Sequence, residues 1–161
     1  MIESDSHTIN VFTDASFDPK TKTGTWAGIV LFNNKEKVLY DILQGVSQHG
    51  MELLSILECL EFIKKHYQDY HLIRIYTDSE YVENLPGRRD RLERNDFLTS
   101  KGNEIAHKDL LMRFYDYLDA LNLEIERVVG HQKSGASIVS DYNRRVDKMS
   151  RKILRQKTRN R

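Results

Sequence analysis

Residues 8–14, TINVFTD, alternate apolar and polar side chains, the pattern of a half-buried β-strand. Two further strand-like stretches follow within thirty residues, Thr23–Phe32 and Lys37–Gln44, and each contains several β-branched or aromatic residues. The links between them, DPKTK and NNKE, have the composition of tight turns. The sequence therefore predicts that the chain begins with three strands in an antiparallel meander.

The remainder of the chain alternates helical and strand-like patterns. The expected elements are a helix over Met51–Tyr67, a strand over His71–Thr77, a short helix capped by Ser79 and broken by Pro86–Gly87, a helix over Gly102–Leu121, a strand over Glu124–Val129, a loop over 132–140 and a helix from Asp141 to about Leu154. This order, βββ-α-β-α-α-β-α, predicts an α/β fold with a mixed sheet and helices on its faces.

Composition indicates an ordinary globular protein. The 161 residues suit one domain, which we expect to span 1–161 with a core of about 8–155. The basic tail over 156–161 is either disordered or a continuation of the last helix. No apolar run approaches the roughly 20 residues that cross a bilayer, and no signal peptide is recognisable. The single cysteine, Cys59, lies in an apolar stretch and is expected to be buried. We expect a cytoplasmic monomer without a membrane partner.

Three acidic residues stand at positions where a ligand site could form. Asp14 is in the first strand, Glu52 is in the first turn of the first long helix, and Asp78 ends the fourth strand. If the first and fourth strands are parallel neighbours, their carboxyl ends bring these acids together. Clustered carboxylates resist ionisation unless a cation lies among them, and Mg²⁺ prefers such oxygen ligands. The alternative is chance, because a chain with 24 acids offers several near strand ends.

Five segments, in order along the chain, resemble signature segments of type 1 ribonuclease H. They are TDAS (13–16), MELLSILECL (51–60), YTDSEYV (76–82), VVGHQ (128–132) and NRRVDKMSR (143–151). The resemblance covers about residues 8–155. It implies the ribonuclease H-like fold, with three antiparallel strands followed by two parallel strands in a five-stranded mixed sheet and helices on both faces.

The resemblance implies an activity and a set of site residues. The expected enzyme is a metal-dependent endonuclease that hydrolyses the RNA strand of RNA–DNA hybrids, leaving 5′-phosphate and 3′-hydroxyl ends. Asp14, Glu52, Asp78 and Asp147 would hold two Mg²⁺ ions, for which Mn²⁺ is an alternative. His131 matches the family's mobile histidine, which is thought to help proton transfer or product release.

The same resemblance predicts where the hybrid is held. Small polar groups near the catalytic acids would contact the minor groove at Ala15, Ser16, Ser47, Gln48 and His49. Relatives commonly have Thr-Asn-Asn where this chain has Ser47-Gln48-His49, and glycine where it has Ala15. We therefore expect hybrid binding with an altered sequence or length preference. Arg88 and Arg89, with Arg91 and Arg94, lie where many relatives have a basic protrusion.

Three other interpretations remain open from the sequence. One is a hybrid- or duplex-binding module without activity, which would keep the basic patches but not the chemistry. Another is a DNA-cutting enzyme on the same scaffold, such as a resolvase or transposase core. The third is a ribonuclease H domain separated from a reverse transcriptase. Trp26 and Phe32 could stack on bases, although their strand spacing favours the core.

Overall fold

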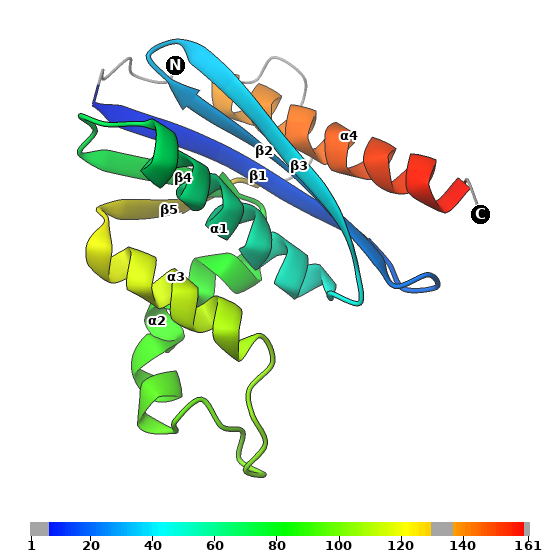
Figure 1. The fold of residues 1–161 in the computed structure, drawn as a ribbon, viewed down its shortest axis with the longest axis vertical. Helices are drawn as coiled ribbons and strands as arrows, with labels where there is room; N and C mark the ends of the chain where they lie inside the picture. The colour runs from blue at the N-terminus through cyan, green and yellow to red at the C-terminus, as the bar shows by residue number, and fades with distance from the viewer. Residues whose placement is uncertain (1–6, 130–136, 160–161) are drawn as a thin grey trace.

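A computed structural model describes residues 7–129 and 137–159 of the chain. The strands form one five-stranded sheet in the order β3-β2-β1-β4-β5 (Figure 1). Their bounds are Thr8–Asp18 (β1), Thr23–Phe32 (β2), Lys35–Gln44 (β3), Leu72–Thr77 (β4) and Leu123–Arg127 (β5). The predicted mixed sheet is confirmed, since β1–β2 and β2–β3 pair antiparallel while β1–β4 and β4–β5 pair parallel.

The register between β1 and β4 sets two predicted acids side by side. Phe12 pairs with Tyr76 in this parallel ladder. Asp14 lies two residues beyond Phe12, and Asp78 lies two residues beyond Tyr76, so both acids stand at the same level of the sheet. Strands β1 and β4 are therefore parallel neighbours, which is the condition under which Asp14 and Asp78 were expected to lie together.

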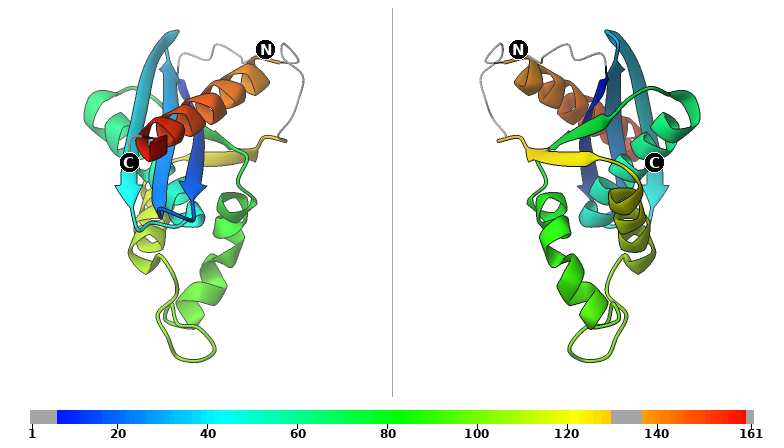
Figure 2. Two further views of the ribbon diagram at one scale, coloured as in Figure 1. Left: turned by 90° about the vertical axis from the view of Figure 1, so that its right-hand side faces the viewer. Right: turned by 90° about the vertical axis from the view of Figure 1, so that its left-hand side faces the viewer.

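The helices cover both faces of the sheet. Their bounds are Gln48–His66 (α1), Glu80–Arg94 (α2), Lys108–Ala120 (α3) and Ile138–Arg159 (α4). Figure 2 shows α4 on one face, with α1 and the other helices on the opposite face. Alternation along β1 explains this layering, because Ile9 and Val11 enter the core under α1 whereas Phe12 enters the core under α4.

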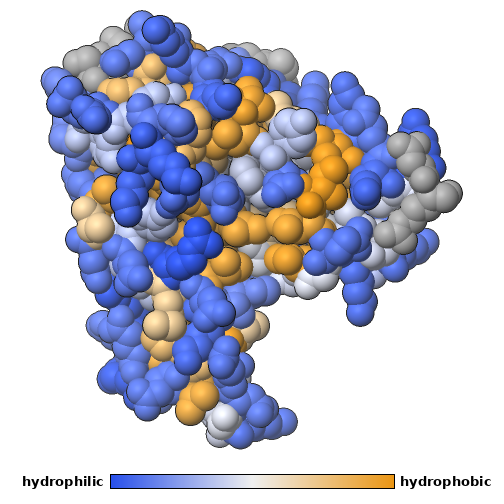
Figure 3. Space-filling view, in the orientation of Figure 1, coloured by the Kyte–Doolittle hydropathy of each residue, from blue (hydrophilic) through white to orange (hydrophobic). Residues whose placement is uncertain are grey.

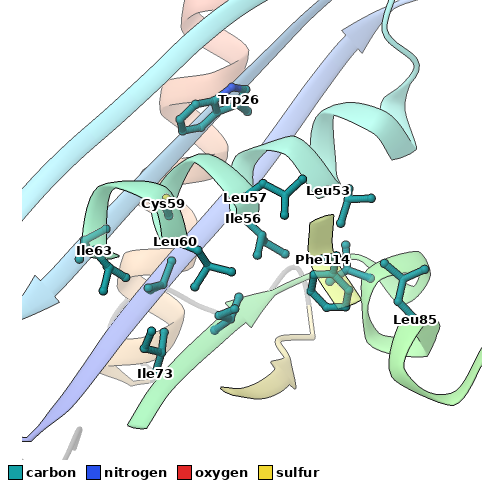
Figure 4. Close-up of a cluster of buried hydrophobic side chains, with 14 of the residues drawn as sticks. Trp26, Leu53, Ile56, Leu57, Cys59, Leu60, Ile63, Ile73, Leu85 and Phe114 are labelled. Atoms are coloured by element: carbon teal, nitrogen blue, oxygen red, sulfur yellow. The ribbon is translucent and has the colours of Figure 1, made fainter. Parts of the chain in front are cut away.

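The larger core lies between α1 and the sheet (Figure 4). Ser47 caps α1 by accepting a hydrogen bond from the Gly50 amide. The apolar residues that follow, among them Leu53, Leu57 and Leu60, are fully buried. Cys59 is also buried, as predicted.

Both aromatic residues that were considered for base stacking belong to this core. Trp26 and Phe32 are buried, with 3% and 9% of their surfaces exposed. Their side chains pack in the larger core. The interpretation of these residues as core rather than as a stacking platform is confirmed.

The prediction that Pro86–Gly87 breaks the second helix is wrong. Helix α2 continues from Glu80 to Arg94, with Pro86 inside it. The proline removes one backbone donor, but Leu85 and Leu92 on either side of it are both buried. Packing of these two leucines outweighs the local penalty at the proline.

The helix predicted from Gly102 begins later, at Lys108. The preceding segment is a loop in which Leu98 and Glu104 form an isolated antiparallel bridge. Gly102 turns this loop with a φ of 81°, a conformation that glycine adopts readily. The predicted helical spacing around Ile105 therefore reflects loop residues that pack against the core.

The final helix is longer than predicted, running from Ile138 to Arg159. Residues 156–159, for which the sequence left both disorder and continuation of the helix open, continue this helix. The last two residues lie outside the described part of the chain. No helix among residues 7–129 and 137–159 is long and apolar enough to cross a membrane.

The contact between β2 and α1 leaves no room for a side chain at Gly28. A Cβ atom there would lie 2.6 Å from the Cys59 sulfur, so we expect Gly28→Ala to lower the free energy of unfolding by about 1–3 kcal/mol. Cys59→Ala should reduce the loss in a double-mutant cycle measured by urea denaturation. Gly87→Ala is the control, because a Cβ atom there meets nothing within 4 Å and should be neutral or stabilising. Equal effects of Gly28→Ala with and without Cys59 would contradict this packing.

Candidate active site

An open, polar pocket lies at the carboxyl ends of β1 and β4. Its volume is about 380 Å³. Carboxylates, small polar groups and two arginines line it: Asp14, Ala15, Ser16, Gln48, His49, Glu52, Asp78, Ser79, Glu80, Tyr81, Arg127, Asp147 and Arg151. The pocket thus brings together segments that are far apart in the sequence.

The four acids predicted as metal ligands all line this pocket. Asp14 comes from β1, Glu52 from the first turns of α1, Asp78 from the residue after β4, and Asp147 from the middle of α4. Asp14 is the most enclosed of them, with 7% of its surface exposed. Both faces of the sheet contribute, since α1 and α4 approach the same strand ends from opposite sides (Figure 2).

Burial and mutual repulsion of the carboxylates govern the electrostatics of the pocket. Burial, the charge of Asp78 and a hydrogen bond with Asp147 raise the pKa of Asp14 to about 9. Burial and the charges of Glu52 and Asp147 raise the pKa of Asp78 as well, although a hydrogen bond from Asp14 opposes this. Without a cation, the pocket therefore retains a proton that these side chains share near neutral pH.

Two polar neighbours fix the carboxylate of Glu52. The Ser79 hydroxyl donates to its Oε2 atom, and the Gln48 side-chain amide donates to its Oε1 atom at 3.1 Å. Gln48 also donates to the Ala15 carbonyl at 3.1 Å, which ties α1 to β1. Ser79 caps α2 at the same time by accepting from the Val82 amide. The sequence predicted the cap but not the contact with Glu52.

Asp147 has a cationic neighbour on its own helix. Arg151, one turn later, places its Nε atom 2.9 Å from Asp147 Oδ1. A hydrogen bond between the hydroxyl groups of Ser150 and Ser16, with 2.9 Å between their oxygens, holds this part of α4 on the sheet. The Thr25 hydroxyl also donates to the Ser150 carbonyl at 2.7 Å.

The donor set fits a hard divalent cation. Carboxylate oxygens are the ligands that Mg²⁺ and Mn²⁺ prefer, and a cation among them would relieve the repulsion that raises the pKa of Asp14. Residues 7–129 and 137–159 contain no group of three or more His, Cys, Asp or Glu side chains already closed around one point. Binding an ion would therefore require the carboxylates to rearrange, and Asp147 is held by its ion pair with Arg151.

The predicted substrate-binding residues differ in their surroundings. Ala15, Ser16, Gln48 and His49 line the pocket. Ser47 does not; it caps α1, and its hydroxyl lies 2.8 Å from His107 Nε2. His49 stacks on Tyr81 with ring centroids 4.3 Å apart.

The two arginines predicted to bind phosphates differ in their contacts within the protein. The Arg88 guanidinium lies 6.0 Å above the Tyr81 ring. Arg89 forms two hydrogen bonds with Asp119, at 2.6 and 2.7 Å, and one with Glu93 at 2.8 Å. Its charge is thus largely offset within the protein. His131, the remaining predicted residue, lies outside the described residues.

Five pocket residues were not predicted from the sequence: Ser79 as a partner of Glu52, Glu80 as a further acid, Tyr81 as a stacking partner, and Arg127 and Arg151 as cations. The spacing of Arg151 from Asp147 is an i,i+4 pair, a signal that could have been read from the helical pattern. Arg127 ends β5 next to β4, and only the sheet order brings it to the site.

Comparisons with known proteins agree with this architecture. The RNase H family model matches residues 6–155. A protein named Ribonuclease H from Caldicellulosiruptor saccharolyticus is 24% identical over 148 residues, which cover 91% of this chain and 95% of the relative. Another with that name, from Nitratidesulfovibrio vulgaris strain DP4, is 30% identical and covers 76% of this chain and 78% of the relative.

Solved structures share the fold at low identity. The solution structure of the PFV RNase H domain superimposes with a TM-score of 0.65 at 18% identity, covering 90% of this chain and 92% of the other. A foamy viral protease-reverse transcriptase in complex with dsDNA gives 0.69 at 15% identity, with coverage of 91% and 92%.

The sheet order, the helices on both faces and the carboxylates at the strand ends define a protein of the ribonuclease H-like class. More particularly, the family match over nearly the whole chain shows that it belongs to the RNase H family. Membership in this family supports nuclease activity, that is, hydrolysis of phosphodiester bonds.

Proposed function

We propose that this protein is an endoribonuclease that hydrolyses the RNA strand of RNA–DNA hybrids by a two-metal-ion mechanism, leaving 5′-phosphate and 3′-hydroxyl ends. The supporting observation is the pocket in which Asp14, Glu52, Asp78 and Asp147 meet. A dead binding module would gain nothing from packing four mutually repelling carboxylates together. Family membership supports the choice of substrate.

The four carboxylates would hold two Mg²⁺ ions, with Mn²⁺ as an alternative. When bound, such ions activate a water and stabilise the leaving oxygen of a phosphodiester. The protein's own task is charge placement: Ser79 and Gln48 keep Glu52 oriented, and the Ala15 amide donates to Asp14 Oδ1 at 2.9 Å. We assign His131 to proton transfer or product release, because an imidazole titrates near working pH.

Recognition of the hybrid rests on polar groups beside the acids. A nuclease that cuts only RNA must contact the 2′-hydroxyl, which accepts and donates hydrogen bonds. Ser16, Gln48 and His49 offer such groups from the pocket wall, while Ala15 adds a methyl group there. Ser47 supports this surface by fixing the start of α1. Arg88 is the better placed of the two predicted phosphate contacts, since Arg89 is paired.

Gln48 and His49 provide a test of this assignment. We expect His49→Ala to weaken hybrid binding severalfold through loss of a contact at the pocket edge. Gln48→Ala should reduce both affinity and turnover, because it also frees Glu52. Affinity is measured by fluorescence anisotropy in EDTA, and turnover is measured in Mg²⁺. Unchanged hybrid affinity in both variants would remove these residues from the substrate surface.

The remaining properties are proposals of the same kind. We propose that residues 1–161 act as one domain and as a monomer in the cytoplasm, without a membrane partner.

A substrate panel tests the proposed function. Purified protein is given labelled RNA–DNA hybrid, single-stranded RNA, duplex RNA, duplex DNA and four-way DNA junctions, in Mg²⁺ and in EDTA. We expect cleavage of the RNA in the hybrid alone, only with Mg²⁺, and ends that a 3′-hydroxyl-dependent polymerase extends. Cutting of DNA would favour the resolvase-like alternative. Binding of the hybrid without turnover would favour the inactive module.

A further inference from the structure

We propose that the C-terminal turns of α4 bind the sugar–phosphate backbone of the substrate outside the pocket, an inference that rests on the proposed function. We call this surface the α4 basic stripe and define it as Lys152, Arg155, Lys157 and Arg159. All four are exposed. The sequence has no acidic residue after Asp147, so nothing on this part of the chain offsets their charge.

The stripe differs from three arginines elsewhere on the described surface that are paired with acids. Arg74, Arg89 and Arg145 each form an ion pair with a neighbouring acid. Within the described residues, no side chain of the stripe forms an ion pair with an acid. Exposed cations that the fold leaves unpaired are available for phosphates.

The stripe begins one residue after Arg151, a side chain of the pocket wall. Arg151 lines the pocket and contacts Asp147. Arg155 and Arg159 follow at intervals of four residues, so they continue along the same side of the helix. Contacts of Ser150 with Ser16 and Thr25 fix the helix just before the stripe, which sets its direction relative to the pocket.

The overall shape leaves this helix end accessible. Figure 1 shows the C-terminal end of α4, in red, at the edge of the molecule, away from the projecting arm formed by α2 and the loop that follows it. The space-filling view shows a concave edge between this arm and the main body, bordered by hydrophobic side chains and surrounded by hydrophilic ones (Figure 3). A duplex seated across the pocket could therefore contact both the arm and α4.

Charge and length favour nucleic acid as the partner. The carboxylate pocket repels phosphates, and cations beside it would offset that repulsion and steer the backbone toward it. From Arg151 to Arg159 the helix rises about 12 Å, at 1.5 Å per residue. At 3.4 Å per base pair, this length corresponds to about four base pairs of duplex beyond the pocket.

The test compares the double variant Arg155→Ala/Arg159→Ala with the control Lys64→Ala/Lys65→Ala. The control removes two exposed cations from the C-terminal end of α1, which Figure 1 places far from the end of α4. Hybrid affinity is measured in EDTA over a series of salt concentrations. We expect the stripe variant to lose roughly tenfold in affinity at low salt and its log–log salt slope to fall by about 2, while the control matches the wild type.

Two further measurements test whether the effect depends on charge and on the length of the hybrid. Arg155→Lys/Arg159→Lys should keep the wild-type salt slope, because phosphate contacts of this kind need only charge. Trimming the hybrid by about four base pairs at one end should abolish the difference between stripe variant and wild type. If the wild type cleaves hybrid while the stripe variant equals the control, the inference is wrong and the proposed function stands. It is also wrong if the stripe binds anionic vesicles but contributes nothing to hybrid affinity. If the wild type neither binds nor cleaves hybrid, the proposed function itself fails.

Discussion

Asp14→Asn is expected to lower Mg²⁺-dependent cleavage of the hybrid by roughly 10³-fold or more, while the chain stays folded. Asp14 is the most enclosed carboxylate of the pocket and contacts both Asp78 and Asp147. The amide that replaces it cannot neutralise a cation. Turnover of labelled hybrid under single-turnover conditions measures the loss. The matched control is Asp116→Asn, an exposed acid on α3, which should retain wild-type turnover.

The same substitution should stabilise the metal-free protein. The folded state holds a proton on Asp14 up to a pKa of about 9, whereas the unfolded chain releases it near the ordinary value of 3.8. Between these values the folded state binds more protons, so stability falls as pH rises. Asparagine does not titrate, and we therefore expect Asp14→Asn to raise the free energy of unfolding in EDTA by about 1–3 kcal/mol at pH 8, and by less at pH 5. Thermal denaturation at the two pH values checks the sign. A variant less stable than the wild type at pH 8 would mean that burial and the neighbouring carboxylates do not raise the pKa of Asp14 in the folded protein.

The second large effect is expected at Phe12, which joins α4 to the sheet. Its ring is fully buried and stacks on Tyr76 at 4.9 Å and on Tyr142 at 4.5 Å between ring centroids. We expect Phe12→Ala to lower the free energy of unfolding by about 3–5 kcal/mol, because it leaves a cavity between β1, β4 and α4. Urea denaturation at neutral pH measures the change.

Phe12→Ala should also reduce hybrid turnover, because α4 supplies Asp147 to the pocket. Phe12→Leu is the control, since it keeps most of the buried volume and should lose less stability and less turnover. Full turnover in a Phe12→Ala protein that is clearly destabilised would show that the seating of α4 does not govern the site.

Much of the fold could be predicted because hydrophobic periodicity and turn composition agree along most of the chain. The meander, the helix after it and the β4 strand follow from local patterns, and the mixed sheet follows from the order of elements. The parallel pairing of β1 with β4 was only a condition of the site argument, and the structure fulfils it. The site followed in part, since Asp14 lies in the first strand, Glu52 lies near the start of the first helix and Asp78 directly follows the fourth strand. Asp147 could not be chosen this way, because an acid within a basic helix looks like a surface ion pair. It was found only through the resemblance to ribonuclease H.

The errors lie where tertiary contacts override local rules. Pro86 normally ends a helix, but burial of Leu85 and Leu92 keeps α2 continuous. The turns after Gly102 have helical spacing but fold as a loop closed by the Leu98–Glu104 bridge. The charge of Arg89 could not be judged from its neighbours in sequence, because its main partner, Asp119, lies thirty residues away. The role of Ser79 in holding Glu52 likewise depends on a contact between two elements.

Ion binding at the carboxylate pocket tests whether the four carboxylates form one metal site. Manganese binding to the purified protein can be counted by electron paramagnetic resonance, with and without a hybrid whose scissile linkage is made uncleavable. We expect two bound Mn²⁺ ions per wild-type chain in the presence of the hybrid, and fewer and weaker sites in Asp14→Asn. A wild-type protein that binds the hybrid but takes up no divalent ion would contradict the proposal that these four side chains form one metal site.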